Sequence, residues 1–189
     1  NALRVLCVDE LHRGNVALIH ASRRRDATKH PPTMARIVRL QATGPIKIEP
    51  PVDGDPHRNS FRNASYPQSD RNFPWQLDGR HKRSLALDLK TDGARTILER
   101  LLKRADVMIV NFPPPARERL RLRWEDIEPI NLRLVYCSLT GYGETGPDRD
   151  RPGFDITAYS GRSGILDAAR YDGGPPGVSL PAQGDRATA

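Results

Sequence analysis

Cysteine is scarce in this chain, with only Cys7 and Cys137 among 189 residues. The two lie far apart, each inside an apolar run, and no CxxC or Cys/His spacing accompanies them. The sequence therefore indicates no zinc or other metal site. We expect both cysteines to be buried thiols of a reducing cytosol rather than partners in a disulfide.

Long apolar runs are also missing. No stretch approaches the ~18 residues that indicate a membrane span. After the apolar residues 3–8 the chain turns polar at once, which is not the pattern of a signal peptide. We therefore expect a cytoplasmic protein that does not engage a membrane.

Acidic residues are outnumbered, 23 against 30 basic ones, which gives a net charge of +7. Such a balance favours anionic partners, whether nucleic acid, a membrane surface or a phosphorylated small molecule. The basic stretch Arg23–Lys29 carries no interleaved aromatic residues and no nucleic-acid motif. A solvated basic loop explains it better than a nucleic-acid site does.

Regular patterns are sparse in the first 80 residues. Residues 3–8 (LRVLCV) and 46–48 predict two short strands, with a basic, poorly patterned stretch between them. Residues 50–78 are rich in Pro, Asn, Ser and Asp, which predicts a long loop.

The pattern tightens from Lys82 onward. A strand at 84–89, an amphipathic helix at 92–104 with Thr91 as N-cap, and a strand at 107–110 form a βαβ unit. Further elements are expected as a strand at 134–139 and helices at 116–120, 124–128 and 154–166. This order predicts an α/β fold with a mainly parallel sheet and flanking helices.

Several short motifs in this region resemble those of the class III coenzyme A transferases (CaiB/BaiF type), a family that includes formyl-CoA and carnitine-CoA transferases. The motifs follow one another in the family's order: IKIEPP at 46–51 with GDP at 54–56, KRSLALDLK at 82–90, ADV at 105–107, NF at 111–112, NLRLVY at 131–136, GYGETGP at 141–147, RPGFD at 151–155 and GD at 184–185. Each motif is weak alone, but the ordered set is specific.

The resemblance implies a Rossmann-like fold and a division of the chain. Residues 1–45 would be a divergent N-terminal segment, and 46–189 the N-terminal part of the family's large domain. The small domain and the C-terminal half would be absent. The chain begins with Asn1 and stops at Ala189 without a terminal cap, which fits the expectation of a fragment.

The family's reaction moves coenzyme A between two carboxylic acids through a single aspartate, and Asp185 occupies the matching position. Its carboxylate would attack an acyl-CoA thioester, with Gly184 as backbone support. The partners implied are an acyl-CoA and a carboxylic acid acceptor, with no permanently bound cofactor. Without the resemblance, this Gly-Asp pair would read as an ordinary turn into a capped helix.

The resemblance also assigns CoA contacts to five residues. Leu87 and Lys90 match positions that contact the nucleotide, Asn111 and Phe112 match the NF pair, and Arg119 matches a phosphate-contacting arginine. Each has a plainer explanation: Lys90 as a solvated strand end, Phe112 as a core aromatic and Arg119 as a surface charge.

The chain departs from the family at three places. The racemase branch has a histidine where this chain has Phe154, which argues against racemisation. Residues 113–115 are PPP where many members have RPG. Residues 7–44 are longer and more basic than the family's segment, and could be an insertion, a frame-shifted stretch or the result of a wrong gene start.

Two main hypotheses and two weaker ones remain open. The chain could be part of a CoA transferase that is inactive alone, since complete members form interlocked homodimers. It could be a non-catalytic remnant that binds CoA or a nucleotide. An acyl-CoA racemase and a nucleic-acid-binding protein are weaker alternatives.

Overall fold

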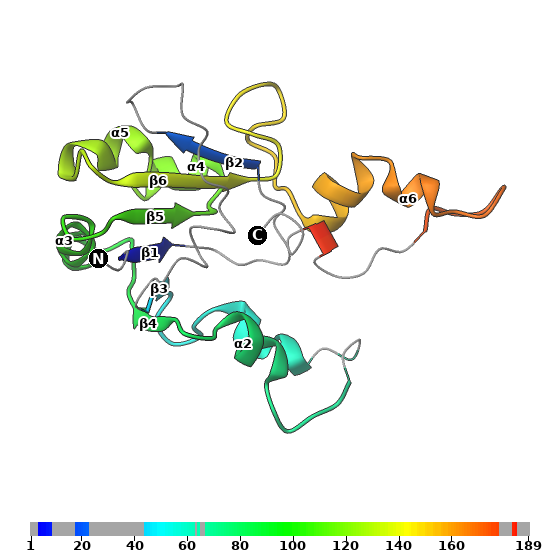
Figure 1. The fold of residues 1–189 in the computed structure, drawn as a ribbon, viewed down its shortest axis with the longest axis horizontal. Coiled ribbons are helices and arrows are strands. Elements are labelled where there is room, and N and C mark those ends of the chain that lie inside the picture. The colour runs from blue at the N-terminus through cyan, green and yellow to red at the C-terminus, as the bar shows by residue number, and fades with distance from the viewer. Residues whose placement is uncertain are drawn as a thin grey trace.

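The computed structural model describes residues 4–8, 18–22, 44–62, 64, 67–177 and 183–184. Within them, six strands form one sheet in the order β2-β6-β5-β1-β3-β4 (Figure 1). All neighbouring pairs are parallel except β2 with β6. The predicted α/β fold with a mainly parallel sheet is therefore confirmed. The strands are β1 (Val5–Val8), β2 (Leu18–Ser22), β3 (Ile46–Glu49), β4 (Arg83–Ala86), β5 (Val107–Val110) and β6 (Val135–Thr140).

The crossover from β4 to β5 runs through helix α3 (Asp92–Leu102). The Thr91 hydroxyl accepts a hydrogen bond from the Ala94 N–H at 3.2 Å, which satisfies one of the unpaired donors of the first turn. The helix buries Leu98 and Leu102, at 1% and 0% exposure, in the same core as the central strands. The predicted helix is thus confirmed, ending two residues early.

Three short helices cover the stretch from β5 to β6: α4 (Pro114–Arg119), α5 (Trp124–Ile127) and the 3-10 helix η2 (Glu128–Ile130). Helix α4 begins two residues before the predicted 116–120, because a proline, having no N–H to satisfy, suits the first helical turn. The phenol of Tyr136 on β6 donates to the Leu122 carbonyl at 2.6 Å and ties this stretch to the sheet.

The prediction of a long loop over residues 50–78 was wrong. A 3-10 helix, η1 (Pro56–Arg62), and helix α2 (Phe73–Asp78) lie within it. The side chain of Asn72 caps α2 by accepting from the Trp75 N–H at 3.2 Å. The proline and asparagine residues that suggested a loop act here as helix starters.

The single helix predicted over 154–166 was also wrong. A π-helical segment, η3 (Asp155–Gly161), is followed by a separate short helix, α6 (Ile165–Ala168). Gly164 stands between them with φ of +81°, a left-handed conformation that ends one helix and redirects the chain.

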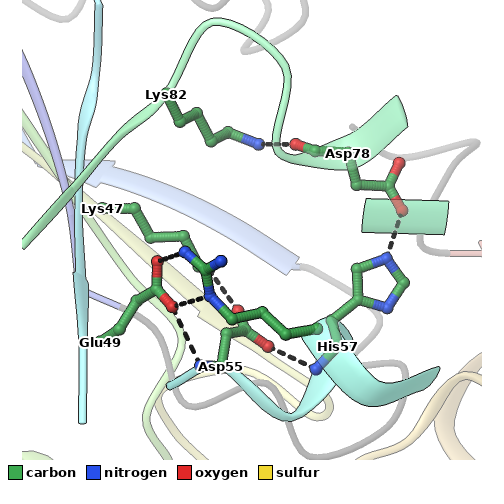
Figure 2. A network of polar contacts seen from close by, with 7 residues as sticks. Lys47, Glu49, Asp55, His57, Asp78 and Lys82 are labelled. Atoms are coloured by element: carbon green, nitrogen blue, oxygen red, sulfur yellow. Dashed lines mark hydrogen bonds and ion pairs between the residues drawn. The ribbon is translucent and has the colours of Figure 1, made fainter. Parts of the chain in front are cut away.

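A buried charge network fixes the turn that follows β3 (Figure 2). Arg58 donates to both carboxylate oxygens of Glu49, at 2.6 and 2.8 Å. Lys47 pairs with Asp55 at 2.7 Å, with both side chains under 7% exposed. A β-carbon on Gly54, where φ is +68°, would lie 2.9 Å from the Arg58 side chain. These contacts explain why the IKIEPP and GDP motifs occur together.

The same network reaches α2. The Asp55 carboxylate accepts from the His57 backbone N–H at 2.7 Å, and the His57 ring contacts the Asp78 carboxylate at 2.8 Å (Figure 2). The Lys82 ammonium in turn donates to the Asp78 carbonyl. The chain on either side of α2 is therefore tied back to the end of β3.

Val52, in the turn after β3, combines a φ of +73° with complete exposure. A β-branched residue is strained in this region by ~1–2 kcal/mol, whereas glycine is not. We expect Val52→Gly to raise the free energy of unfolding by roughly 1 kcal/mol, net of the extra entropy of glycine in the unfolded chain. Chemical denaturation measures this. Val52→Ala keeps the β-carbon and should therefore gain less stability than Val52→Gly. Equal free energies of unfolding for the parent and the two variants would contradict the strain at position 52.

The predicted divergent N-terminal segment lies mostly outside the described residues. Its strand β2 pairs antiparallel with β6, which the sequence did not predict. Cys7 and Cys137 are both free thiols, as expected, but only Cys137 is buried and Cys7 is half-buried. Both are register partners of Ile109, on opposite sides of β5. Burial raises the pKa of the Cys137 thiol to about 11. Among the described residues, no helix is long and apolar enough to span a membrane.

Candidate functional site

A pocket of about 190 Å³ lies where β5 and β6 end. Ligands of parallel α/β sheets bind outside the carboxyl ends of the strands, so this is the expected edge for a site. Figure 1 shows η3 and α6 on the same side, beyond the tips of β1 and β5. The pocket is lined by Asn111, Pro113, Pro114, Thr140, Gly141, Arg149, Arg151, Pro152, Gly153 and Phe154.

One wall of the pocket is the loop of residues 141–153, called here the glycine-rich loop. Its first and last residues, Gly141 and Gly153, pack backbone against backbone. A β-carbon on Gly141 would lie 2.5 Å from the Gly153 Cα, closer than any side chain allows. Glycine at both positions is what lets the loop close on itself beside β6.

Two cations stand at the pocket, Arg149 and Arg151. Their side chains are 52% and 72% exposed and pair with Asp150 and Asp148, at 3.0 and 3.1 Å. Exposed pairs of this kind are weak, so the guanidinium groups can exchange partners for an incoming anion. Proline and phenyl surfaces provide the apolar part of the lining.

The residue before the predicted nucleophile is anchored at this edge. The Gly184 N–H donates to the Asp155 carboxylate, Oδ1, at 2.6 Å, and both residues are buried. A β-carbon at position 184 would lie 2.4 Å from Cγ of Tyr159 and 2.7 Å from that carboxylate oxygen. Asp155 follows directly after the pocket residue Phe154. Asp185 itself lies outside the described residues.

The five predicted CoA contacts do not converge. Asn111 is 7% exposed and lines the pocket. Leu87 belongs to the hydrophobic core, and Phe112 packs against it. Lys90 and Arg119 are exposed, and neither lines the pocket.

Three pocket residues, Thr140, Arg149 and Arg151, had no predicted site role, although Arg151 opens the RPGFD motif. Thr140 ends β6, one residue beyond the predicted strand at 134–139, and its hydroxyl accepts from the Gly143 N–H at 2.9 Å. The position of a polar residue at a strand's carboxyl end was the available signal. The arginines alternate with aspartates in the DRDR run at 148–151, which by itself reads as a solvated loop.

The family model described as CoA-transferase family III matches residues 46–189. The chain belongs to CoA-transferase family III. Curated relatives include cinnamoyl-CoA:phenyllactate CoA-transferase of Clostridium sporogenes, 36% identical over 141 residues. That alignment covers 74% of this chain and 34% of the relative. Acetyl-CoA:oxalate CoA-transferase of Acetobacter aceti is 37% identical over 131 residues, covering 69% of this chain and 32% of the relative.

Solved structures are similar to this chain as well. A CAIB/BAIF family protein from Brucella suis is similar with a TM-score of 0.68 and 27% identity, over 94% of this chain and 43% of that one. Rv3272 from Mycobacterium tuberculosis gives a TM-score of 0.68 and 28% identity, over 98% of this chain and 45% of that one. This family III chain thus spans about a third of the length of the curated relatives it matches.

Proposed function

We propose that the chain supplies the nucleophile and part of the CoA site of a CoA transferase, with Asp185 as the acyl acceptor. Family membership supports the reaction class. The contact of Gly184 with Asp155 is the observation that carries the assignment, because it anchors the residue next to Asp185 one position from the pocket wall.

The proposed reaction has two half-reactions. The Asp185 carboxylate attacks the thioester carbonyl of the donor, forming a mixed anhydride and expelling CoA thiolate. The thiolate then attacks the aspartyl carbonyl, which releases the donor acid and leaves an aspartyl-CoA thioester. The acceptor carboxylate repeats these steps in reverse order, giving a new acyl-CoA and restoring the free carboxylate.

The hydrogen bond of Gly184 indicates which role this residue has. Its N–H is directed to the Asp155 carboxylate, so we assign it to anchoring the nucleophile's segment rather than to stabilising an oxyanion. The space at Gly184 is filled by the Tyr159 side chain, which excludes a larger residue. Oxyanion stabilisation would then fall to other donors.

For CoA, we propose that the pocket takes part of the phosphate-bearing end. Asn111 offers an amide from the end of β5, and Arg149 with Arg151 offers positive charge. Lys90 and Arg119 are both exposed and lie outside the pocket, where they would contact the nucleotide part of CoA. Leu87 and Phe112 support this edge from the core.

Isothermal titration with CoA tests the binding site directly. Arg151→Ala and Arg149→Ala should each weaken CoA binding about threefold to tenfold, because each removes one charge-assisted contact. Raising the salt concentration should reduce the difference in CoA affinity between the parent and each of these two variants, because salt screens the arginine charges. Arg170→Ala removes an exposed arginine that does not line the pocket and should leave the affinity for CoA unchanged. Equal losses in all three variants, or no binding by the parent, would contradict the proposal.

We further propose that this chain alone does not transfer CoA, because its relatives are about three times as long as the matched segment. A complete transferase would act in the cytoplasm as a homodimer. Binding without transfer is also what a non-catalytic remnant would show. Joining residues 46–189 to the remaining segment of a relative distinguishes a transferase part from a non-catalytic remnant, because only a transferase part restores turnover.

A further inference from the structure

Helix α4 carries a buried cation, Arg117, whose side chain is 4% exposed. A guanidinium taken out of water is costly unless its donors are paired. Two of its nitrogens are paired: Nη2 donates to both Glu144 oxygens at 2.9 and 2.8 Å, and Nη1 donates to the Ser138 hydroxyl at 2.7 Å. The Ser138 hydroxyl in turn donates to Glu144.

These three residues come from three different elements. Arg117 is on α4, Ser138 is on β6, and Glu144 belongs to the glycine-rich loop. The triad therefore fixes the loop to the helix and to the strand at one point. Burial lowers the pKa of the Arg117 guanidinium, but hydrogen bonds to Glu144 and Tyr136 outweigh it and raise the pKa, so the cation persists at every physiological pH.

Glu144 sits between two flexible positions of the loop. Gly143 and Gly146 have φ of +90° and +93°, and added β-carbons there would meet nothing within 4 Å. Backbone of this kind has little intrinsic preference for one conformation. The side chain between these glycines is therefore well placed to decide where the following residues, Arg149 and Arg151, stand at the pocket.

We propose that Arg117 is a positioning residue for the CoA pocket, acting through Glu144 on the glycine-rich loop. The inference rests on the proposed function for its effect on CoA, but its effect on the loop stands apart from any ligand. Arg117 itself does not line the pocket. Its two Nη groups reach Ser138 and Glu144 at the same time, which the single ammonium of a lysine cannot do with the same planar geometry.

Two readouts test the proposal on the 189-residue chain. Hydrogen exchange should be at least tenfold faster across residues 141–153 in Arg117→Met, with β1 and β5 unchanged. CoA affinity, by titration, should fall about tenfold in the same variant. In Arg117→Lys, the exchange rate and the CoA affinity should both lie between those of the parent and those of Arg117→Met. Arg100 is an exposed arginine on α3, and Arg100→Met should change neither the exchange rate nor the affinity.

Glu144→Gln keeps the shape of the side chain and provides the second variant if Arg117→Met fails to fold. It should speed exchange in the same loop, and the double variant Arg117→Met/Glu144→Gln should lose no more CoA affinity than Arg117→Met alone. Additive losses, or a loop whose exchange stays at the parent rate in folded variants, would overturn the positioning role. A parent chain that does not bind CoA, with the exchange results as expected, would instead refute the proposed function and leave the loop anchor standing.

Discussion

Glu49→Gln should lower the free energy of unfolding by about 3 kcal/mol, the largest stability effect that the structure predicts. The carboxylate is 3% exposed and accepts two hydrogen bonds from Arg58 and one from the Asp55 N–H. Burial alone would raise the pKa of Glu49, but these bonds and one from Ser84 outweigh it and lower the pKa to about 2.

The pH dependence gives the sign of the effect. The Glu49 pKa is depressed in the folded chain from its ordinary value of 4.5, so its contribution is complete above about pH 4.5 and is lost as the pH falls toward 2. Denaturation at pH 7 and at pH 3 should therefore show the parent and Glu49→Gln converging at the lower pH.

Glu118→Gln is the matched control for Glu49→Gln. Glu118 also pairs with an arginine, Arg123, but at 3.4 Å and with its own side chain 67% exposed. Exposed pairs contribute less than ~1 kcal/mol, so this variant should be near the parent. Equal losses in the two variants would contradict the role of the buried network.

Asp185→Asn should abolish acyl transfer, the largest expected effect on activity. The suitable assay uses a chimera in which residues 46–189 replace the matching segment of the Acetobacter aceti relative. Asparagine keeps the size of the side chain but cannot form the anhydride, so transfer should fall about 1,000-fold or more. Transfer of labelled CoA between two acids, followed by chromatography, measures it.

Asp172→Asn is the control for that loss. Asp172 is exposed, lies near Asp185 in the sequence, and has no proposed role in the reaction. Its variant should keep the parent rate. Full activity of Asp185→Asn would move the nucleophile elsewhere, and an inactive parent chimera would favour a non-catalytic remnant.

Five of the six described strands were predictable from the sequence, because they are short apolar runs or, at 84–89, an alternating pattern; β2, inside the poorly patterned stretch, was not predicted. The strand at 107–110 is buried on both faces, so it is recognisable as a continuous apolar run without alternating polar residues. The helix at 92–102 is recognisable by its regular apolar face. Residues 50–78 were not predictable in the same way. Their helices are short and are stabilised by caps and tertiary ion pairs rather than by an apolar stripe.

The site was predictable in its location but not in its composition. In the structure Asn111 lines the pocket and Gly184 contacts Asp155, while the roles that the motifs assign to residues 111 and 184 stay predictions. Arg117 was missed because an arginine on a short helix normally reads as a solvated charge. Its burial depends on Glu144, which is 27 residues away, and no local pattern encodes that pairing.

Trapping the covalent intermediate tests the role of Asp185 most directly. The chimera would be incubated with acyl-CoA, trapped with hydroxylamine and cleaved after arginine. Asp185 then falls in the peptide 171–186, whose side chains include only one other carboxylate, Asp172. We expect a hydroxamate on Asp185, located by fragmentation and absent from Asp185→Asn. A hydroxamate on another residue, or none in a chimera that transfers CoA, would contradict it.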